Sequence, residues 1–393
     1  MTAETAQKFK ALEDQANKLR DIFTGAGYEP VAPAILQPAD IFLDQVGEAL
    51  RARTYVFSGL DGEELCLRPD LTVPTCRLYL ERHPSADTVA KYSYNGPAFR
   101  FQPQSADEAQ PREFRQAGIE NIGSSNKGKA ETEVLSLISQ SVKECGLSNY
   151  IIKFGDLALF KALINALDIP ERWSRRLMQH FWNPETFLEQ LNMLTARGTG
   201  REACINTILA KLTAAEPEKA PELVREYLDS KDIPFFGNRK ISEITERLQG
   251  QLADLKANPL SEEKVTFIEN YLSICARPKA AGARIADLAH AAGINLDTQL
   301  QNYTKRLDLF AEAGIDLSNA VFAAEFGREL EYYSGFVFQL EVPDLKGKAG
   351  QIAGGGRYDS LIGDIDSGRH APAVGSAIHT ERLLEAVEGM GNE

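Results

Sequence analysis

A polar loop, Pro103–Pro111, is flanked by side chains that could bind a small charged molecule. Arg100 stands just before this loop, and Gln116 and Glu120 follow on the segment that leaves it. Because Gln116 and Glu120 are four residues apart, they point to the same face if that segment is a strand. A guanidinium on one arm, with an amide and a carboxylate on the other, suits a small zwitterion. The guanidinium would face its carboxylate, and Glu120 would face a cationic or donor group.

Two segments with strand-like composition must position these side chains. The residues that give them this character are Tyr92, Tyr94, Phe99 and Phe101 before the loop, and Phe114, Ile119 and Ile122 after it. Aromatic and β-branched residues favour strands, and the two prolines between the segments indicate a loop. We therefore predict a β-hairpin with a long loop.

A second polar pair, Asp70 and Thr72, lies where a predicted hairpin meets a helix. Segments 55–57 and 64–67 flank the Asp61-Gly62 dipeptide, which is a typical hairpin turn. Pro74 stands just inside the start of the following helix. Residues at such junctions often belong to functional sites.

The N-terminal segment is predicted to form an amphipathic helix over residues 5–24. The apolar residues that recur at helical spacing are Phe9, Leu12, Ala16, Leu19 and Phe23. The extended stretch Tyr28–Leu36 follows and contains Pro30 and Pro33. Prolines at these positions indicate an edge strand or a strand at a subunit boundary.

Composition indicates a globular protein of two or three domains. The chain has 393 residues, of which 43% are hydrophobic, and its net charge is −13. This acidic balance argues against bulk binding of nucleic acid, which depends on Lys and Arg. The N-terminus has no signal-peptide pattern, and no apolar run reaches membrane-spanning length, so we expect a cytoplasmic protein. The histidines lack metal-ligand spacing, and we expect free thiols rather than disulfides at Cys66, Cys76, Cys145, Cys204 and Cys275.

The middle of the chain has a different character from its two ends. From Leu157 to about Asp316 it is rich in Leu, Ala, Glu and Lys with helical periodicity. We expect residues 157–319 to form a helical insertion or second domain. Residues 1–156 and 320–393 would form the main α+β domain.

Strand patterns return after this helical segment. Residues 320–326 and 336–340 are strand-like, and Val374 begins a strand that runs into a final helix. Between them Gly354–Gly356 follow a further strand, where glycines allow a ligand or another strand to approach the backbone. A bulge or tight turn is the alternative explanation for these glycines.

One glycine-containing loop is close to a phosphate-binding pattern. Residues Gly123–Lys129 lie between a strand and a helix, but Ala130 stands where Ser or Thr should hold magnesium. We favour a polar loop that caps the following helix over a phosphate site.

These segments, in this order, resemble the catalytic domain of a class II aminoacyl-tRNA synthetase, the histidine-tRNA ligase. The first class motif, which makes a dimer interface, is similar to the N-terminal helix through Pro33. The resemblance implies a mainly antiparallel sheet flanked by helices. The remaining segments that carry it are Arg68–Thr72, Phe99–Phe101 with Arg112–Gln116, Arg328–Tyr333, Gly354–Asp359 and Glu381-Arg382.

The resemblance also implies a histidine pocket. In the family, residues at the positions of Asp70, Thr72 and Gln116 hold the α-ammonium group. Those at Arg100 and Arg328 lie toward the carboxylate, and those at Glu120 and Tyr333 bond the imidazole nitrogens. The implied histidine-binding set is therefore Asp70, Thr72, Arg100, Gln116, Glu120, Arg328, Tyr332 and Tyr333.

The departures from the ligase affect its nucleotide and tRNA sites. Gln102 stands where the family has a Glu that contacts ATP, and His379 stands where a Gly leaves room for ATP. Glu329 also replaces a Gly near the expected phosphates, and Asp70 replaces a Glu that is one methylene longer. An anticodon-binding domain is not expected. The resemblance thus implies an amino-acid pocket without catalytic residues or a cofactor.

This combination resembles the non-catalytic ligase paralogues that regulate short-form ATP phosphoribosyltransferase. It implies L-histidine as effector of the first step of histidine biosynthesis, without tRNA or membrane partners. The implied assembly is a hetero-octamer of four regulatory and four catalytic subunits, with a self-dimer within it. Two alternatives stay open at this point: an active histidine-tRNA ligase, favoured by Arg100, Arg328 and Arg382, and a ligase-like protein that activates another substrate or senses histidine for another partner.

Overall fold

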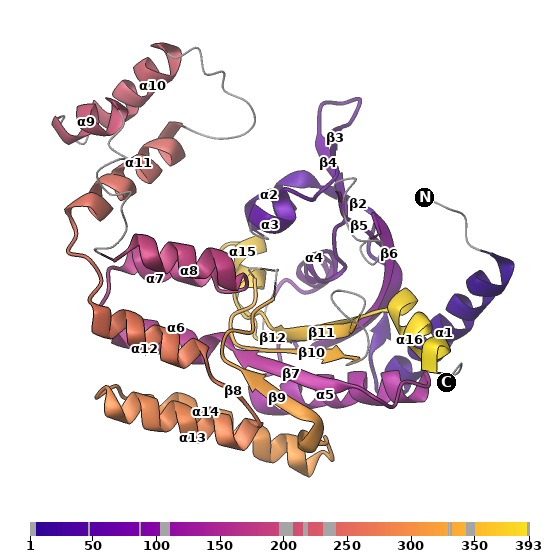
Figure 1. Ribbon diagram of the computed structural model, residues 1–393. Coiled ribbons are helices and arrows are strands. Elements are labelled where there is room, and N and C mark those ends of the chain that lie inside the picture. The colour runs from indigo at the N-terminus through magenta and orange to yellow at the C-terminus, as the bar shows by residue number, and fades with distance from the viewer. Residues whose placement is uncertain are drawn as a thin grey trace. The chain divides into compact units, whose positions relative to one another are not determined.

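The computed structural model divides into two compact units (Figure 1). The first comprises Met1–Ala166 with Asn270–Glu393, and the second comprises Leu167–Glu269. The residues that the structure describes are 5–45, 48–85, 88–102, 111–195, 207–214, 219–230, 241–328, 330, 332–342 and 350–390.

The described part of the first unit is built on a nine-stranded mixed sheet in the order β1-β5-β6-β12-β11-β10-β7-β9-β8. Neighbouring strands are antiparallel except for the parallel pairs β1-β5 and β7-β9. A mainly antiparallel sheet with flanking helices is the predicted fold class. The strands are β1 (Glu29–Pro30), β5 (Ala90–Phe99), β6 (Glu113–Ile122), β7 (Ile151–Asp156), β8 (Cys275–Ala276), β9 (Ala320–Ala323), β10 (Phe336–Glu341), β11 (Gln351–Arg357) and β12 (Ala373–His379).

The predicted long hairpin is present as β5 and β6. It pairs without interruption from Ala90 opposite Ile122 to Phe99 opposite Glu113. Strand β1, which contains Pro30, lies at one edge of the sheet, as its proline indicated. The glycine-rich segment lies inside β11 and not after a strand, and the neighbouring strands β10 and β12 approach Gly355 and Gly356 closely, as predicted. The alternative, a bulge or tight turn, is wrong.

A smaller antiparallel sheet precedes the main hairpin. Its order is β2-β4-β3, and the hairpin of β3 and β4 contains Gly62 with a φ of 87°. This matches the turn predicted at Asp61-Gly62. The elements of this region are β2 (Leu36–Pro38), α2 (Ala39–Gln45), α3 (Glu48–Arg51), β3 (Val56–Ser58), β4 (Glu64–Leu67) and α4 (Thr72–Arg82).

Helix α1 (Ala6–Gly25) begins with Thr5, whose side chain accepts a hydrogen bond from the Lys8 N–H at 3.2 Å. The buried residues begin at Leu12, whereas Phe9, predicted on the apolar face, is 50% exposed. Helix α5 (Lys127–Glu144) begins after Asn126, which accepts from the Lys129 N–H. Asn126 therefore caps the first turn of α5 and binds a backbone N–H that a phosphate would need, which favours the capping loop over the phosphate loop.

The helical middle is divided between the two units. In the first unit, α6 (Leu157–Ala166), α13 (Pro278–Ala291) and α14 (Asp297–Glu312) contact strands or one another, and β8 pairs with β9. Because these elements belong to the first unit, the second unit is shorter than the predicted helical segment 157–319. The other helices are α7 (Glu171–His180), α8 (Pro184–Met193), α9 (Thr207–Ala214), α10 (Ala220–Ser230), α11 (Ile241–Lys256) and α12 (Glu262–Leu272), then η2 (Leu317–Asn319), α15 (Leu361–Ile365) and α16 (Thr380–Met390).

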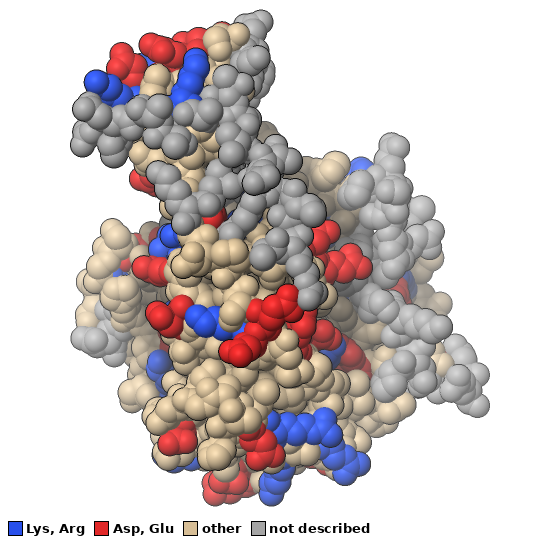
Figure 2. Space-filling view, turned by 60° about the vertical axis from the view of Figure 1, so that its left-hand side comes forward, with Lys and Arg blue, Asp and Glu red and all other residues tan. Residues whose placement is uncertain are grey.

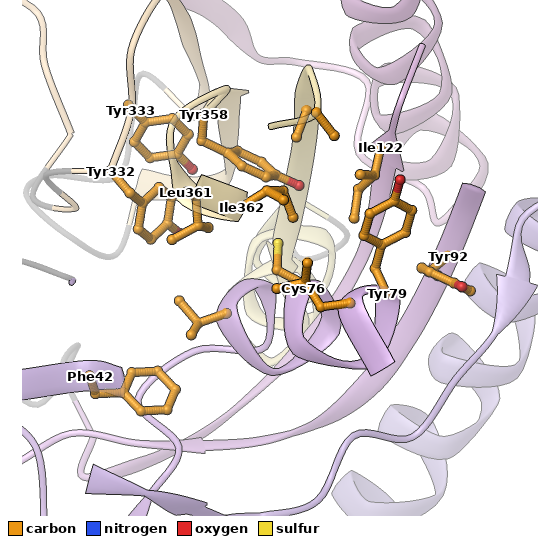
Figure 3. Packing of buried hydrophobic residues seen from close by; sticks show 14 of the residues in the cluster. Phe42, Cys76, Tyr79, Tyr92, Ile122, Tyr332, Tyr333, Tyr358, Leu361 and Ile362 are labelled. Carbon is orange, nitrogen blue, oxygen red and sulfur yellow. The ribbon is translucent and has the colours of Figure 1, made fainter. Parts of the chain in front are cut away.

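A tyrosine-rich core joins the two sheets of the first unit. Figure 3 shows Tyr332, Tyr333 and Tyr358 close together, with Cys76 of α4 facing the same core. On the outer surface, acidic side chains gather across the middle of the face seen in Figure 2, in keeping with the net charge of −13. No helix among the described residues is both long and apolar enough to cross a membrane.

Candidate histidine pocket

Glu120 lies at the centre of the candidate site and is 0% exposed. Its carboxylate accepts hydrogen bonds from the hydroxyls of Thr72 at 2.7 Å, Tyr94 at 3.0 Å and Tyr358. Opposite it on β12 is Gly375, where any Cβ would overlap the Glu120 Oε2 atom. The glycine therefore makes the space that this carboxylate occupies.

Burial changes the protonation of Glu120. Loss of solvation raises its pKa to about 7, although the hydroxyls of Tyr358, Thr72 and Tyr94 lower it in part. The nearby carboxylate of Asp70 raises it further. A carboxyl group with this pKa changes its charge near neutral pH.

Asp70 is a second buried carboxylate in the same pocket and is 2% exposed. It lies just before α4, where its Oδ1 accepts from the Val73 N–H and its Oδ2 accepts from the Tyr332 hydroxyl, both at 3.2 Å. Burial raises its pKa, while the positive charge of Arg100 opposes that rise.

Tyrosine rings surround these carboxylates. The ring of Tyr332 lies 4.9 Å from that of Tyr333 and 5.7 Å from that of Tyr358, measured between centroids (Figure 3). Burial raises the pKa of all three phenols, so each remains a neutral hydrogen-bond donor at neutral pH.

Arg328, which follows β9 in the sequence, contacts both the tyrosines and the glycine strand β11. Its guanidinium lies 5.9 Å from the centre of the Tyr333 ring, and its Nη1 donates to Gln339 Oε1 at 3.1 Å. A Cβ at Gly354 would overlap this guanidinium, so the glycine explains why the strand passes so closely. Among the described residues, the buried Nε of Arg328 has no hydrogen-bond partner.

Arg100 and Gln116 lie at another side of the pocket. Arg100 donates from Nε to the Pro69 carbonyl at 2.9 Å and lies 5.1 Å from the centre of the Phe114 ring. Gln116 is 6% exposed and lies on the same face of β6 as Glu120, with Gly118 midway between them. Of the predicted residues, direct hydrogen bonds or ring contacts thus link Thr72 to Glu120, Asp70 to Tyr332, and Tyr333 to both Tyr332 and Arg328.

Two tyrosines that donate hydrogen bonds to Glu120 were not among the predicted site residues. They are Tyr94 and Tyr358. Tyr94 lies opposite Gly118 in the hairpin, and a Cβ at Gly118 would be 2.6 Å from its hydroxyl. A large aromatic residue facing a glycine across a predicted hairpin was therefore the available signal. Tyr358 was within the quoted Gly354–Asp359 segment, but its partner is more than two hundred residues away in the sequence.

One of the departures from the ligase, His379, lies beside Phe114. The His379 ring is 5.3 Å from the Phe114 ring, on which Arg100 also lies. Gln102 is 7% exposed, and its backbone carbonyl accepts from Arg112. Glu329 lies outside the described residues. Within those residues, no group of three or more His, Cys, Asp or Glu side chains is arranged to hold a metal ion.

Free buried thiols were predicted for the cysteines, and among the described ones Cys66 and Cys76 are buried, whereas Cys145 is half-buried and Cys275 is exposed. Cys66, Cys76, Cys145 and Cys275 have free thiols, and Cys204 lies outside the described residues. Burial raises the pKa of Cys76 well above its ordinary value, and the charges of Glu120 and Asp70 add to this effect. It therefore remains a neutral thiol in the wall of the pocket.

Comparisons with known proteins show the family of this chain. The histidyl-tRNA synthetase family model matches residues 5–383. A protein of Rhizobium rhizogenes called ATP phosphoribosyltransferase regulatory subunit is 32% identical over 95% of this chain and 98% of its own length. A protein of Brucella anthropi with the same name is also 32% identical, over 93% of this chain and 95% of its own length. The chain belongs to the histidyl-tRNA synthetase family, among its ATP phosphoribosyltransferase regulatory subunits.

A solved structure shows the same fold. It is described as an ATP phosphoribosyltransferase regulatory subunit/histidyl-tRNA synthetase from Bacillus halodurans. The TM-score is 0.68 at 20% identity, and the match covers 98% of this chain and 82% of the other. At this identity the match supports the fold of the regulatory-subunit family, whereas the site is argued from the residues above.

Proposed function

We propose that this chain is the regulatory subunit of a short-form ATP phosphoribosyltransferase and binds free L-histidine in the pocket around Glu120. The relatives named above carry that regulatory-subunit name over nearly their whole length. The observation that carries the ligand assignment is the burial of two carboxylates, Glu120 and Asp70. Glu120 accepts from three hydroxyls, and Asp70 accepts from a hydroxyl and a backbone N–H. Buried carboxylates favour a cationic or donor ligand.

Histidine has the groups that this pocket can bind. Its α-ammonium would bond Asp70, Thr72 and Gln116, and its imidazole nitrogens would bond Glu120 and Tyr333. Arg100 and Arg328 would face its carboxylate, where guanidinium groups bind well. Tyr332 would orient Asp70, to which its hydroxyl donates.

We further propose that the chain does not form histidyl-adenylate. The position of His379 beside Phe114 supports this, because the ligase resemblance implies a Gly at residue 379 that leaves room for ATP. Gln102 supports it as well, since an amide replaces the carboxylate expected to contact the nucleotide.

The assembly is the last part of the proposal. The partner would be the catalytic subunit, in a cytoplasmic hetero-octamer of four regulatory and four catalytic chains without tRNA. A dimer of this chain would form within it. Histidine would regulate the enzyme if its affinity differs between two states of the assembly.

Titration calorimetry with histidine tests the ligand assignment. Glu120→Ala and Tyr333→Phe should each weaken binding, because each leaves an imidazole nitrogen without its partner. A lost buried hydrogen bond costs about 1–3 kcal/mol. Tyr303→Phe is a matched control that removes a buried hydroxyl bonded to the Pro278 carbonyl, and it should leave the affinity unchanged. Equal affinities in all four proteins would place histidine elsewhere.

A further inference from the structure

A second group of buried charges lies outside the residues assigned to histidine. It consists of Arg306 on α14, Glu131 on α5, Asp156 at the end of β7 and Arg357 at the end of β11. Their side chains are 12%, 3%, 5% and 6% exposed. Charges at this depth are stable only when they are paired with good geometry.

One carboxylate joins the two guanidinium groups. Glu131 accepts from Arg306 Nε at 2.6 Å through one oxygen and from Arg357 Nε at 2.5 Å through the other. Arg306 also donates from Nη1 to Asp156 Oδ2 at 2.6 Å. Burial alone would lower the pKa of Arg306, but Glu131 and Asp156 raise it above its ordinary value. Arg306 is therefore a permanent cation between two elements.

Arg357 connects this group to the pocket. Its Nη1 donates to Asp359 Oδ1 at 2.8 Å, so the residues on both sides of Tyr358 belong to the same network. Ser334 reinforces the connection, since its N–H donates to the Arg357 carbonyl at 2.8 Å and its hydroxyl accepts from the Asp359 N–H at 3.0 Å. The hydroxyl of Tyr358, held between these anchors, donates to Glu120.

We propose that Arg306 is a positioning residue for the histidine pocket, acting through Glu131 and Arg357 on Tyr358. This inference rests on the proposed function. Arg306 contributes because its planar guanidinium bonds two carboxylates from different elements at once. Without it, Glu131 keeps Arg357 as its partner but loses the guanidinium that fixes its other oxygen. The Glu131–Arg357 pair then shifts, and the hydroxyl of Tyr358 no longer meets Glu120 in the geometry that histidine binding needs.

A charge-balanced double substitution tests this role. Arg306→Met with Glu131→Gln removes one cation and one anion, while the amide oxygen at 131 can still accept from Arg357. The control is Lys91→Met with Glu133→Gln. It also removes an ion pair of helix α5, with an N–O distance of 2.7 Å, but this pair does not involve Arg357, the residue next to Tyr358. In calorimetry we expect at least ten-fold weaker histidine binding in the first variant and less than a two-fold change in the control.

The same substitutions in a Tyr358→Phe background separate positioning from general loss of structure. If Arg306 acts through Tyr358, the Arg306/Glu131 change should weaken binding less than two-fold once the hydroxyl is gone. An equal fold-loss in both backgrounds would overturn the proposal. Should the double variant fail to fold, Arg306→Lys serves in its place, because it keeps the charge but cannot bond both carboxylates in the same way.

Two further results are decisive in different ways. If the wild-type chain binds histidine and the Arg306 variants bind it equally well, the positioning role is wrong while the proposed function stands. If the wild-type chain binds no histidine, alone or with the catalytic subunit, the proposed ligand is wrong and the positioning role with it.

Discussion

The pKa of Glu120 depends on the hydrogen-bond donors that surround its buried carboxylate. Hydroxyls of Thr72, Tyr94 and Tyr358 satisfy the carboxylate without neutralising it. Neutral donors compensate less for lost solvation than a cation would, which is why the pKa rises to about 7. A ligand that brings a positive charge or an N–H group would stabilise the ionised form.

This raised pKa predicts how stability depends on pH. The folded value of about 7 exceeds the reference value of 4.5, so the folded chain binds more protons between these values. The contribution of Glu120 to stability is therefore fully present below pH 4.5 and is lost as the pH rises through 7. Between pH 5 and pH 8 the loss should amount to roughly 2–3 kcal/mol.

Glu120→Gln isolates this contribution, because glutamine has a similar shape and does not titrate. Relative to the wild type, its unfolding free energy should rise by that amount between pH 5 and pH 8. Denaturant unfolding at both pH values measures the difference. A constant difference at the two pH values would contradict the raised pKa.

Gly375 predicts a steric effect at the same place. A methyl group in Gly375→Ala would overlap the Glu120 carboxylate, so we expect about 1–3 kcal/mol of destabilisation together with loss of histidine binding. Thermal unfolding and calorimetry report the two effects. Normal histidine affinity in this variant would show that the carboxylate does not need its present position.

At the scale of elements, the sequence predicted those that depend on local patterns. Aromatic and β-branched residues on both sides of a polar loop predicted β5 and β6, and the Asp61-Gly62 turn predicted the hairpin of β3 and β4. The position of Gly354–Gly356 inside β11 was not predictable locally. Arg328 and the strands β10 and β12 lie so close to these glycines that a side chain would not fit. A short stretch of sequence does not show these long-range contacts.

The candidate site, like the elements, could be inferred from the sequence only where local patterns or the family resemblance indicate its residues. Local patterns indicated five of the eight proposed residues, and the resemblance added Arg328, Tyr332 and Tyr333. Tyr94 and Tyr358 join Glu120 through sheet pairing and long-range packing. The helical middle posed a related difficulty. Its periodicity is uniform along the chain, whereas the two-residue strand β8 and the ion pairs of Arg306 tie part of it to the sheet.

A glycine inside helix α11 gives a prediction for the second unit. A Cβ at Gly250 would meet nothing within 4 Å, and the residue lies well inside Ile241–Lys256. Gly250→Ala should therefore stabilise this helix by about 0.5–1 kcal/mol. Hydrogen exchange of the α11 amides in the full chain would report it, and faster exchange in the variant would contradict the open space.

At the scale of the whole molecule, a histidyl-tRNA synthetase fold carries Gln102 and His379 at two positions where the ligase resemblance implies nucleotide contacts. His379 against Phe114 and Gln102 near Arg112 predict that histidine-dependent exchange of pyrophosphate into ATP remains at background. Exchange measured with labelled pyrophosphate checks this. Exchange that required both histidine and Arg328 would favour an active ligase over the proposed regulatory role.

The measurement that tests the regulatory role most directly is the rate of phosphoribosyl-ATP formation by a short-form catalytic subunit, titrated with histidine in the presence of this chain. We predict that the two proteins assemble, as sized by light scattering, that the rate rises on assembly, and that histidine then lowers it. Gln116→Ala with Glu120→Ala should leave assembly intact and blunt the histidine response, because coupling requires ligand binding whereas assembly does not. Failure to assemble, with a catalytic rate indifferent to this chain, would contradict the account.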